Sequence, residues 1–154
     1  MKLAVIMIAV VVIFASGAIA GFVFRYDLIA FKAYTDKYRY LPGELVNVTA
    51  KYTNHGLFSV SLTFRTSAMA ILAVYSDNGS FVCGIPGESL KVITHVSLGP
   101  GESIAFGAHW NQTVEEQIQA PYPSDYFVMA STLSSEFHAM ATTASFTISG
   151  DPSA

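Results

Sequence analysis

Residues 46–54, Val-Asn-Val-Thr-Ala-Lys-Tyr-Thr-Asn, decide the fold class of this chain. Their even-numbered positions are apolar as far as Tyr52, and their odd-numbered positions are polar or charged. Successive side chains of a strand point to opposite faces, so this alternation is typical of a strand with one buried and one solvated face. Residues 58–64 repeat the alternation, and Asn54-His55-Gly56 between the two runs predicts a hairpin turn that makes them neighbouring strands.

The rest of the body carries more short runs of strand character. We predict strands at residues 70–76, 80–83, 90–98, 103–110, 126–133 and 137–149. Turn-forming residues separate most of these runs, as in Asp77-Asn78-Gly79 and Gly99-Pro100-Gly101. Seven or eight short strands without a helical period predict an all-β fold, an immunoglobulin-like antiparallel β-sandwich over residues 44–149 with a short tail at 150–154.

The composition narrows the class of protein. The 154 residues are 52% hydrophobic and only 12% charged, with a formal net charge of -3. A disordered polyelectrolyte has the opposite balance, and nucleic-acid binding needs clustered basic residues that this sequence lacks. The single cysteine, Cys83, excludes an intrachain disulfide, so we expect a small buried apolar side chain there, with an intermolecular disulfide as the alternative.

The N-terminal segment is uncharged from Leu3 to Phe24, which is typical of a membrane-targeting segment. It predicts either a cleaved signal peptide over residues 1–20 or an uncleaved membrane anchor over residues 3–24. Four basic residues follow it: Arg25, Lys32, Lys37 and Arg39. Because positive charge is preferentially kept on the cytoplasmic side, these residues favour cleavage after Ala20 over an anchor. Either version predicts an extracellular or cell-surface protein.

Three N-glycosylation sequons follow the leader. Their acceptor residues are Asn47, Asn78 and Asn111. In an exported chain they predict a glycosylated surface protein, and chance matches in a sequence rich in Ser and Thr are the alternative.

Residues 21–43 form an apolar and aromatic arm that includes the first strand. The arm's candidates for contact between subunits are Phe22, Val23, Phe24, Leu28, Ile29 and Phe31. An arm of this kind, freed by cleavage, would bury itself either in its own sheet or at the open edge of a neighbouring subunit. The second route assembles subunits head to tail by strand exchange, whereas the first makes the arm an ordinary first strand.

Three motifs in the body form a recognisable series. They are Val74-Tyr75-Ser76-Asp77-Asn78-Gly79, then Leu98-Gly99-Pro100-Gly101-Glu102-Ser103 with Trp110 beyond it, and Tyr126-Phe127-Val128-Met129-Ala130. The series resembles the bacterial intracellular proteinase inhibitor (BsuPI-like) family over roughly residues 44–133. The resemblance implies an immunoglobulin-like sandwich, no catalysis and inhibition of a serine protease. Cys83 in place of an aromatic residue and the export leader depart from the family, so the fold transfers better than the activity.

The histidines are the side chains best suited to acid–base chemistry near neutral pH. None of the four lies in a catalytic or metal-binding motif. His95 and His109 flank the Gly99-Pro100-Gly101 turn, and we expect the strands on either side to pair, with both histidines on the outer face and no carboxylate beside them to complete a metal site. We therefore predict neither an enzyme, nor a metal site, nor a cofactor.

Two prolines rigidify the loop Pro121-Tyr122-Pro123, which makes it a candidate partner-binding loop, with a structural turn as the alternative. Trp110 ends an apolar strand face and is expected in the core. The sequence thus predicts a non-catalytic, exported cell-surface protein that acts through protein–protein association. Such a protein would be a glycosylated, pilus-like filament or envelope subunit whose N-terminal arm exchanges strands.

The alternative function is a secreted or membrane-anchored BsuPI-like protease inhibitor. The expected partners are a second copy of the chain or another surface protein, or a protease under the alternative. The membrane is a partner during export or through residues 3–24, and nucleic acid is not.

Overall fold

The structure is a computed structural model that describes residues 28–85, 90–114, 118–137 and 140–150. The predicted leader and the first part of the arm, including Phe22, Val23 and Phe24, lie outside the described residues. The same holds for His138 and for the tail beyond Gly150.

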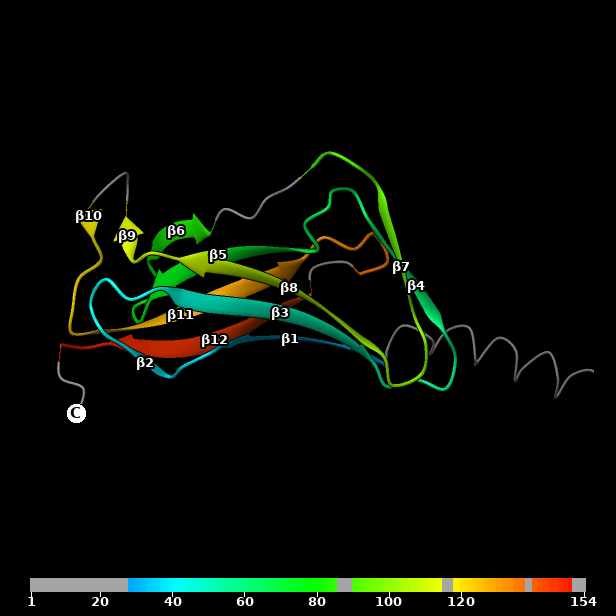
Figure 1. Cartoon of the computed structure of the whole chain (residues 1–154), viewed down its shortest axis with the longest axis horizontal. Coiled ribbons are helices and arrows are strands. Elements are labelled where there is room, and N and C mark those ends of the chain that lie inside the picture. Colours follow the sequence, from blue (N-terminus) through cyan, green and yellow to red (C-terminus); the bar gives the residue numbers. More distant parts are fainter. Residues whose placement is uncertain (1–27, 86–89, 115–117, 138–139, 151–154) are drawn as a thin grey trace, which may run out of the picture.

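Two β-sheets pack face to face as a sandwich (Figure 1). The smaller sheet has the strand order β1 (Ile29–Thr35), β3 (Val46–Asn54), β8 (Ser103–Trp110). The larger sheet has the order β2 (Arg39–Tyr40), β12 (Ala141–Ile148), β11 (Ser124–Thr132), β5 (Ala70–Ser76), β6 (Phe81–Ile85). Two ribbons complete the described fold, β4 (Val60–Phe64) with β7 (Thr94–Leu98) and β9 (Thr113–Val114) with β10 (Ile118–Gln119). The fold class is therefore the predicted immunoglobulin-like β-sandwich.

The two ribbons lie at opposite ends of the sandwich (Figure 1). The β4–β7 ribbon lies at the end where β1 begins, and the β9–β10 ribbon lies at the end where β8 finishes. We call these the β1 end and the β8 end of the molecule.

The core follows from the alternation of side chains. The four inward positions of β3, from Val46 to Tyr52, are at most 1% exposed. The five-stranded sheet supplies the facing residues Leu72, Val74, Tyr126, Val128, Phe146 and Ile148. Removing these apolar surfaces from water provides the main driving force for folding. No intrachain disulfide adds to it, because the chain has a single cysteine.

Tyr52 occupies the centre of this core and links its two layers. Its ring stacks on Phe31 with a centroid separation of 4.6 Å and meets the ring of Phe64 edge-on at 5.6 Å. Its hydroxyl donates to the carbonyl oxygen of Met69 at 2.7 Å and lies 2.6 Å from Oγ1 of Thr132. Because the buried hydroxyl has partners just before β5 and in β11, these hydrogen bonds offset the cost of removing it from water.

The predicted hairpin between the first two strands of the body is wrong. β3 pairs with β1 and β8, whereas β4 pairs with β7. The chain leaves the three-stranded sheet at Asn54, whose fully buried Nδ2 donates to the carbonyl oxygens of Phe58, Leu98 and Gly99 at 2.8, 2.9 and 3.1 Å. Apolar alternation is the same for a strand beside its neighbour and a strand across the core, so it could not distinguish the two arrangements.

The predicted pairing across Gly99-Pro100-Gly101 is wrong for a similar reason. β7 pairs with β4 and β8 pairs with β3, so the chain passes from the β4–β7 ribbon to the three-stranded sheet at this turn. The backbone NH of Gly101 donates to the carbonyl oxygen of Asn54 at 2.8 Å, which ties this turn to the turn after β3. Gly101 has a φ of 76°, a backbone conformation that favours glycine.

The sandwich also begins earlier than the predicted boundary at residue 44. β1 and β2 belong to the smaller and the larger sheet respectively, so the segment at residues 29–40 contributes to both layers. The described residues contain twelve strands, three of them only two residues long, in place of the predicted seven or eight. One pairing, between β2 and β12, is parallel. The predicted strands at 70–76 and 103–110 coincide with β5 and β8.

Replacing Tyr52 by Phe is expected to lower the free energy of unfolding by about 1 to 3 kcal/mol, because Met69 and Thr132 lose a buried hydrogen-bond partner. Urea denaturation of the purified protein measures this change. The matched control is Tyr34→Phe, at a tyrosine that is 47% exposed, and its effect is expected to stay within about 0.5 kcal/mol. Equal effects of the two substitutions would contradict the linking role of Tyr52.

Candidate interaction surfaces

Large apolar side chains cover part of the outer face of the five-stranded sheet. The rings of Tyr75 and Phe127 stack with centroids 5.3 Å apart, and Phe81 meets Tyr75 edge-on at 5.7 Å. These rings form a row across β6, β5 and β11, because Tyr75 is the register partner of both Phe81 and Phe127. Ile71 lies further along the same face of β5. Ile71 and Phe81 are 56% and 63% exposed.

We call the set Ile71, Tyr75, Phe81, Phe127 and Met129 the aromatic face. Its side chains point away from the core because their neighbours in sequence, such as Val74 and Val128, are the fully buried ones. Single exposed apolar residues are ordinary, but a row of them on one face of a sheet is uncommon on a soluble monomer.

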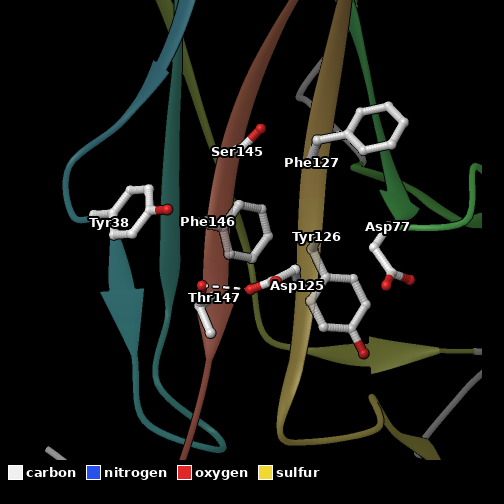
Figure 2. Close-up of a pocket in the computed structure, with 8 residues that line it drawn as sticks. All are labelled: Tyr38, Asp77, Asp125, Tyr126, Phe127, Ser145, Phe146 and Thr147. Carbon is white, nitrogen blue, oxygen red and sulfur yellow. Dashed lines mark hydrogen bonds between the residues drawn. The ribbon is translucent and has the colours of Figure 1, made fainter. Parts of the chain in front are cut away.

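A hollow of about 290 Å³ borders the aromatic face (Figure 2). It is lined by Tyr38, Asp77, Asp125, Tyr126, Phe127, Ser145, Phe146 and Thr147. Oγ1 of Thr147 donates to Oδ1 of Asp125 at 2.6 Å, and the backbone NH of Asp77 donates to the carbonyl oxygen of Asp125 at 3.1 Å. The hollow thus combines the two exposed carboxylates of Asp77 and Asp125 with the aromatic side chains of Tyr38, Tyr126, Phe127 and Phe146.

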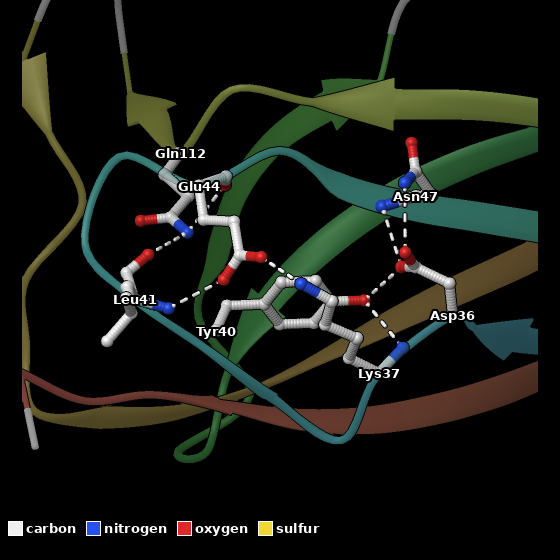
Figure 3. Close-up of polar contacts among 7 residues, drawn as sticks. All are labelled: Asp36, Lys37, Tyr40, Leu41, Glu44, Asn47 and Gln112. Atoms are coloured by element: carbon white, nitrogen blue, oxygen red, sulfur yellow. Dashed lines mark hydrogen bonds and ion pairs between the residues drawn. The ribbon is translucent and has the colours of Figure 1, made fainter. Parts of the chain in front are cut away.

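A polar network holds the turn that connects the two sheets (Figure 3). The hydroxyl of Tyr40 donates to Oδ1 of Asp36 at 2.5 Å and accepts from the backbone NH of Lys37 at 3.1 Å. Nδ2 of Asn47 donates to Oδ2 of Asp36 at 2.9 Å, and Lys37 forms an ion pair with Glu44. The network fixes the chain at the point where it passes from β1 to β2.

The network shifts the titration of its members. Burial, followed by the hydrogen bond to Asp36, raises the pKa of Tyr40 to about 12. Burial also opposes ionisation of Asp36, but the hydrogen bonds from Tyr40 and Asn47 outweigh it and lower the pKa of that carboxyl below its ordinary value.

Gln112 was not singled out from the sequence, yet it is fully buried and closes the same region (Figure 3). Its Nε2 donates to the carbonyl oxygens of Leu41 and Glu44 at 2.8 and 2.7 Å, and its Oε1 accepts from the NH of Gly43 at 2.7 Å. Gln112 has a φ of 61°, so it directs its amide inward from a sharp turn after β8. No sequence motif predicts that Gln112 binds the backbone of residues 41–44, because these two segments are far apart in sequence.

All three predicted sequon asparagines are exposed in the structure. Asn47 lies near the start of β3 opposite His109, and Asn111 directly follows β8, so both lie at the β8 end. Asn78 lies in the turn between β5 and β6, which Figure 1 places at the same end of the sandwich. Their use as glycosylation sites stays a prediction.

The described part of the predicted arm is split between core and surface. Ile29 and Phe31 are 4% and 7% exposed and pack into the chain's own core through β1, whereas Leu28 is 45% exposed. Within a single copy, β1 is therefore an ordinary first strand of the chain's own sandwich, the alternative to strand exchange that the sequence left open. β1 lies at the edge of its sheet, with β3 as its one neighbour in the strand order.

The predicted partner loop is at the surface. Tyr122 is 53% exposed, and both flanking prolines are exposed. The peptide bond between Tyr122 and Pro123 is cis. The hydroxyl of Tyr126 donates to the carbonyl oxygen of Pro121 at 2.6 Å, which anchors the loop to β11.

The structure separates the two histidines that flank the Gly99-Pro100-Gly101 turn. His95 lies on β7 beside Thr63, whose Oγ1 is 3.2 Å from its Nδ1, whereas His109 lies on β8 opposite Asn47. Both histidines are exposed, but the expectation that their strands pair is wrong, because β7 and β8 belong to different sheets. Among the described residues, no three His, Cys, Asp or Glu side chains gather where they could hold a metal ion.

Cys83 and Trp110 both contact the core. Cys83 is partly buried against it, and this burial raises the pKa of the Cys83 thiol. Trp110 is 3% exposed, and its Nε1 donates to the carbonyl oxygen of Thr113 at 2.9 Å. None of the described residues forms a helix with the length and hydropathy that crossing a membrane requires.

Comparison with known proteins gives a likeness of fold alone. No family model and no curated protein matches the sequence. Spo0M, a sporulation control protein from Bacillus subtilis, is 15% identical with a TM-score of 0.46, and the match covers 81% of this chain and 51% of that one. The chain thus spans about half the length of Spo0M.

Two further solved structures are similar at the same level. The CARDB domain of the PF1109 protein from Pyrococcus furiosus, in complex with di-metal ions, is 14% identical with a TM-score of 0.42, over 80% of this chain and 94% of that domain. A β-glucosidase from Erythrobacter marinus is 12% identical with a TM-score of 0.41, over 75% of this chain and 15% of the enzyme. At such values no activity or ligand passes from these proteins to this chain.

Raising the pH is expected to destabilise the protein through Tyr40. Its pKa is about 12 in the folded chain, against an ordinary value of 10.0, so the unfolded chain loses this proton first. The stability that neutral Tyr40 contributes is fully present below pH 10.0 and declines as the pH rises towards 12. Urea unfolding at a series of alkaline pH values measures the decline. Tyr40→Phe should make it shallower, and an unchanged slope would contradict the assignment.

Proposed function

We propose that this chain is a non-catalytic, exported cell-surface protein that acts through protein–protein association. Its role would be that of a subunit in a glycosylated extracellular filament or envelope layer. The aromatic face is the observation that carries the proposal, because two of its five side chains, those of Ile71 and Phe81, are more than half exposed and the other three are partly exposed.

Export rests on the sequence of the leader, uncharged from Leu3 to Phe24. The exposed positions of Asn47, Asn78 and Asn111 are compatible with glycans outside the cell. A glycan needs solvent around its acceptor, and a buried sequon would have argued against this part of the proposal.

Strand exchange through the N-terminal arm is the specific form of self-association that we propose. β1 is an edge strand, so it can leave its sheet without breaking any ladder other than the one with β3. Its departure would uncover the places of Ile29 and Phe31 in the core, which β1 of a second copy could fill with the same side chains.

Protease inhibition is the second candidate, and the exposed Tyr122 favours it. This residue lies between two exposed prolines, in a loop anchored by Tyr126, as an inhibitory loop held in one conformation would. Titration of serine proteases with the purified chain separates this candidate from association, because an inhibitor blocks its protease stoichiometrically.

The double substitution Ile71→Ser and Phe81→Ser is expected to weaken association by about 10- to 100-fold in dissociation constant, since the aromatic face loses its two most exposed side chains. Sedimentation velocity over a concentration series, with negative-stain imaging, measures this. Leu45→Ser is the matched control, because Leu45 is 51% exposed and lies away from the aromatic face. If Leu45→Ser weakens association as much as the double substitution does, the aromatic face is not the association surface.

A disulfide between β1 and β3 tests strand exchange. Ala30 and Thr53 are register partners on these antiparallel strands, so Ala30→Cys with Thr53→Cys places two thiols within disulfide reach. Cys83→Ala in the same chain removes the competing thiol. We expect assemblies in the reduced protein and none in the oxidised protein, whose β1 cannot leave. Equal assembly in both redox states would show that the subunits associate without exchanging β1.

A further inference from the structure

An exposed apolar tip projects from the β1 end of the sandwich. It consists of Leu57 and Phe58, which are 83% and 65% exposed, in the loop that connects β3 with β4. Leu28, which is 45% exposed, lies beside this loop. The backbone NH of His55 donates to the carbonyl oxygen of Leu28 at 2.9 Å, so the loop and the start of β1 are joined directly.

The tip is held outward by the buried amide of Asn54. Its Nδ2 donates to the carbonyl oxygen of Phe58 at 2.8 Å, and its Oδ1 accepts from the NH of Gly56 at 2.8 Å. Both ends of the exposed segment are therefore fixed to a side chain with no solvent contact. A loop constrained in this way presents its two apolar side chains at little further cost in conformational entropy.

The tip lies where the leader joins the body. Leu28 is the first described residue and stands four positions after Phe24, the last residue of the uncharged run. Four extended residues span at most about 14 Å, so the end of that run cannot lie far from Leu28 and the tip.

The opposite end of the molecule has a different character. Asn47 and Asn111 lie at the β8 end, as does the turn that contains Asn78 (Figure 1). All three sequons therefore lie at the end of the body farthest from Leu28, whereas the tip lies at the end nearest to it. The β8 end also has exposed apolar side chains, those of Leu41, Leu45 and Tyr122, so the position of the leader and of the sequons distinguishes the two ends.

The basic residues after the leader are spread along this length. β1 runs from the β1 end towards the β8 end, because Ile29 pairs with Asn54 and Thr35 pairs with Val48. At about 3.3 Å per residue, Lys37 and Arg39 lie beyond the far end of a strand about 23 Å long. The preference for positive charge on the cytoplasmic side depends on basic residues close to the membrane. Lys37 and Arg39 therefore contribute little to the argument for cleavage. Arg25 is the basic residue nearest the leader, with Asp27 two positions later.

We propose that Leu57, Phe58 and Leu28 rest in the interfacial layer of the membrane in which residues 3–24 of the same chain remain inserted. The β1 end then faces the lipid, and the sequons and the aromatic face project away from it or to its side. His55 and Glu102 are exposed at this end and would lie at the level of the lipid headgroups. The inference rests on the proposed function only in requiring that the leader reach a membrane, and it replaces an arm freed by cleavage with an arm that stays joined to its anchor.

Tryptophan scanning of the full chain tests this orientation. Phe58→Trp and Leu57→Trp each place an indole at the tip, and Leu45→Trp places one at an exposed position near the β8 end. Each protein is reconstituted into phosphatidylcholine vesicles with and without brominated acyl chains, which quench indoles at the membrane. Trp110 is 3% exposed in the folded chain, so the unsubstituted protein supplies the baseline.

We expect both tip variants to lose emission to the brominated lipid beyond that baseline, with emission shifted to shorter wavelength, and Leu45→Trp to show neither change. Equal quenching at the tip and at Leu45, or none at either, would overturn the proposed orientation. A shift to shorter wavelength without quenching would overturn it too, because the tip would then be covered by protein. Thermal unfolding midpoints equal to that of the unsubstituted chain verify that all variants fold.

The mass of the chain extracted from the membranes of an expressing cell supplies the second readout. A chain that retains residues 1–20 supports the inference, and a chain that begins at Gly21 overturns it. Neither result bears on association through the aromatic face, which is measured separately by sedimentation of the variants at Ile71 and Phe81.

Discussion

The side-chain amide of Asn54, fully removed from solvent, donates to three carbonyl oxygens and accepts one backbone NH. It thereby joins the turn after β3 to the turn between β7 and β8, where the chain leaves the three-stranded sheet for the β4–β7 ribbon and returns from it. An unpaired amide at this depth would cost several kcal/mol, so both turns must keep the geometry that satisfies it. The β4–β7 ribbon and the apolar tip are positioned as a result of this constraint.

Two other buried polar side chains serve the same purpose elsewhere. Tyr52 ties the three-stranded sheet to the ends of β5 and β11, and Gln112 closes the turn before β3. The apolar core makes collapse favourable, but it does not select one arrangement of layers from several with similar burial. In this chain a few buried amides and hydroxyls select one arrangement of the layers, because each of them has hydrogen-bond partners from distant segments.

The sequence allowed the strands to be predicted but not their arrangement in sheets, because that arrangement depends on these buried polar side chains. Period-2 alternation located β3 and β4, and with them the β-sandwich, because it depends only on neighbours in sequence. It could not show that β3 and β4 lie in different sheets, nor that Phe58 is exposed, because both depend on Asn54. The aromatic face was missed because Tyr75 and Phe127 follow buried apolar residues. The continuous apolar run from Ala70 to Tyr75, which occupies both faces of a strand, is the signal that could have revealed it.

The course of the N-terminal strand has a mechanical consequence. The described body begins with β1 at one end of the sandwich, and its last strand, β12, finishes at the other end (Figure 1). Tension applied between these two ends would act along β1 and load its seven register pairs with β3 at the same time, in shear. A ladder loaded in shear must lose many hydrogen bonds together, whereas a ladder peeled from one end loses them in turn. The ladder between β1 and β3 therefore opposes stretching along the long axis of the sandwich.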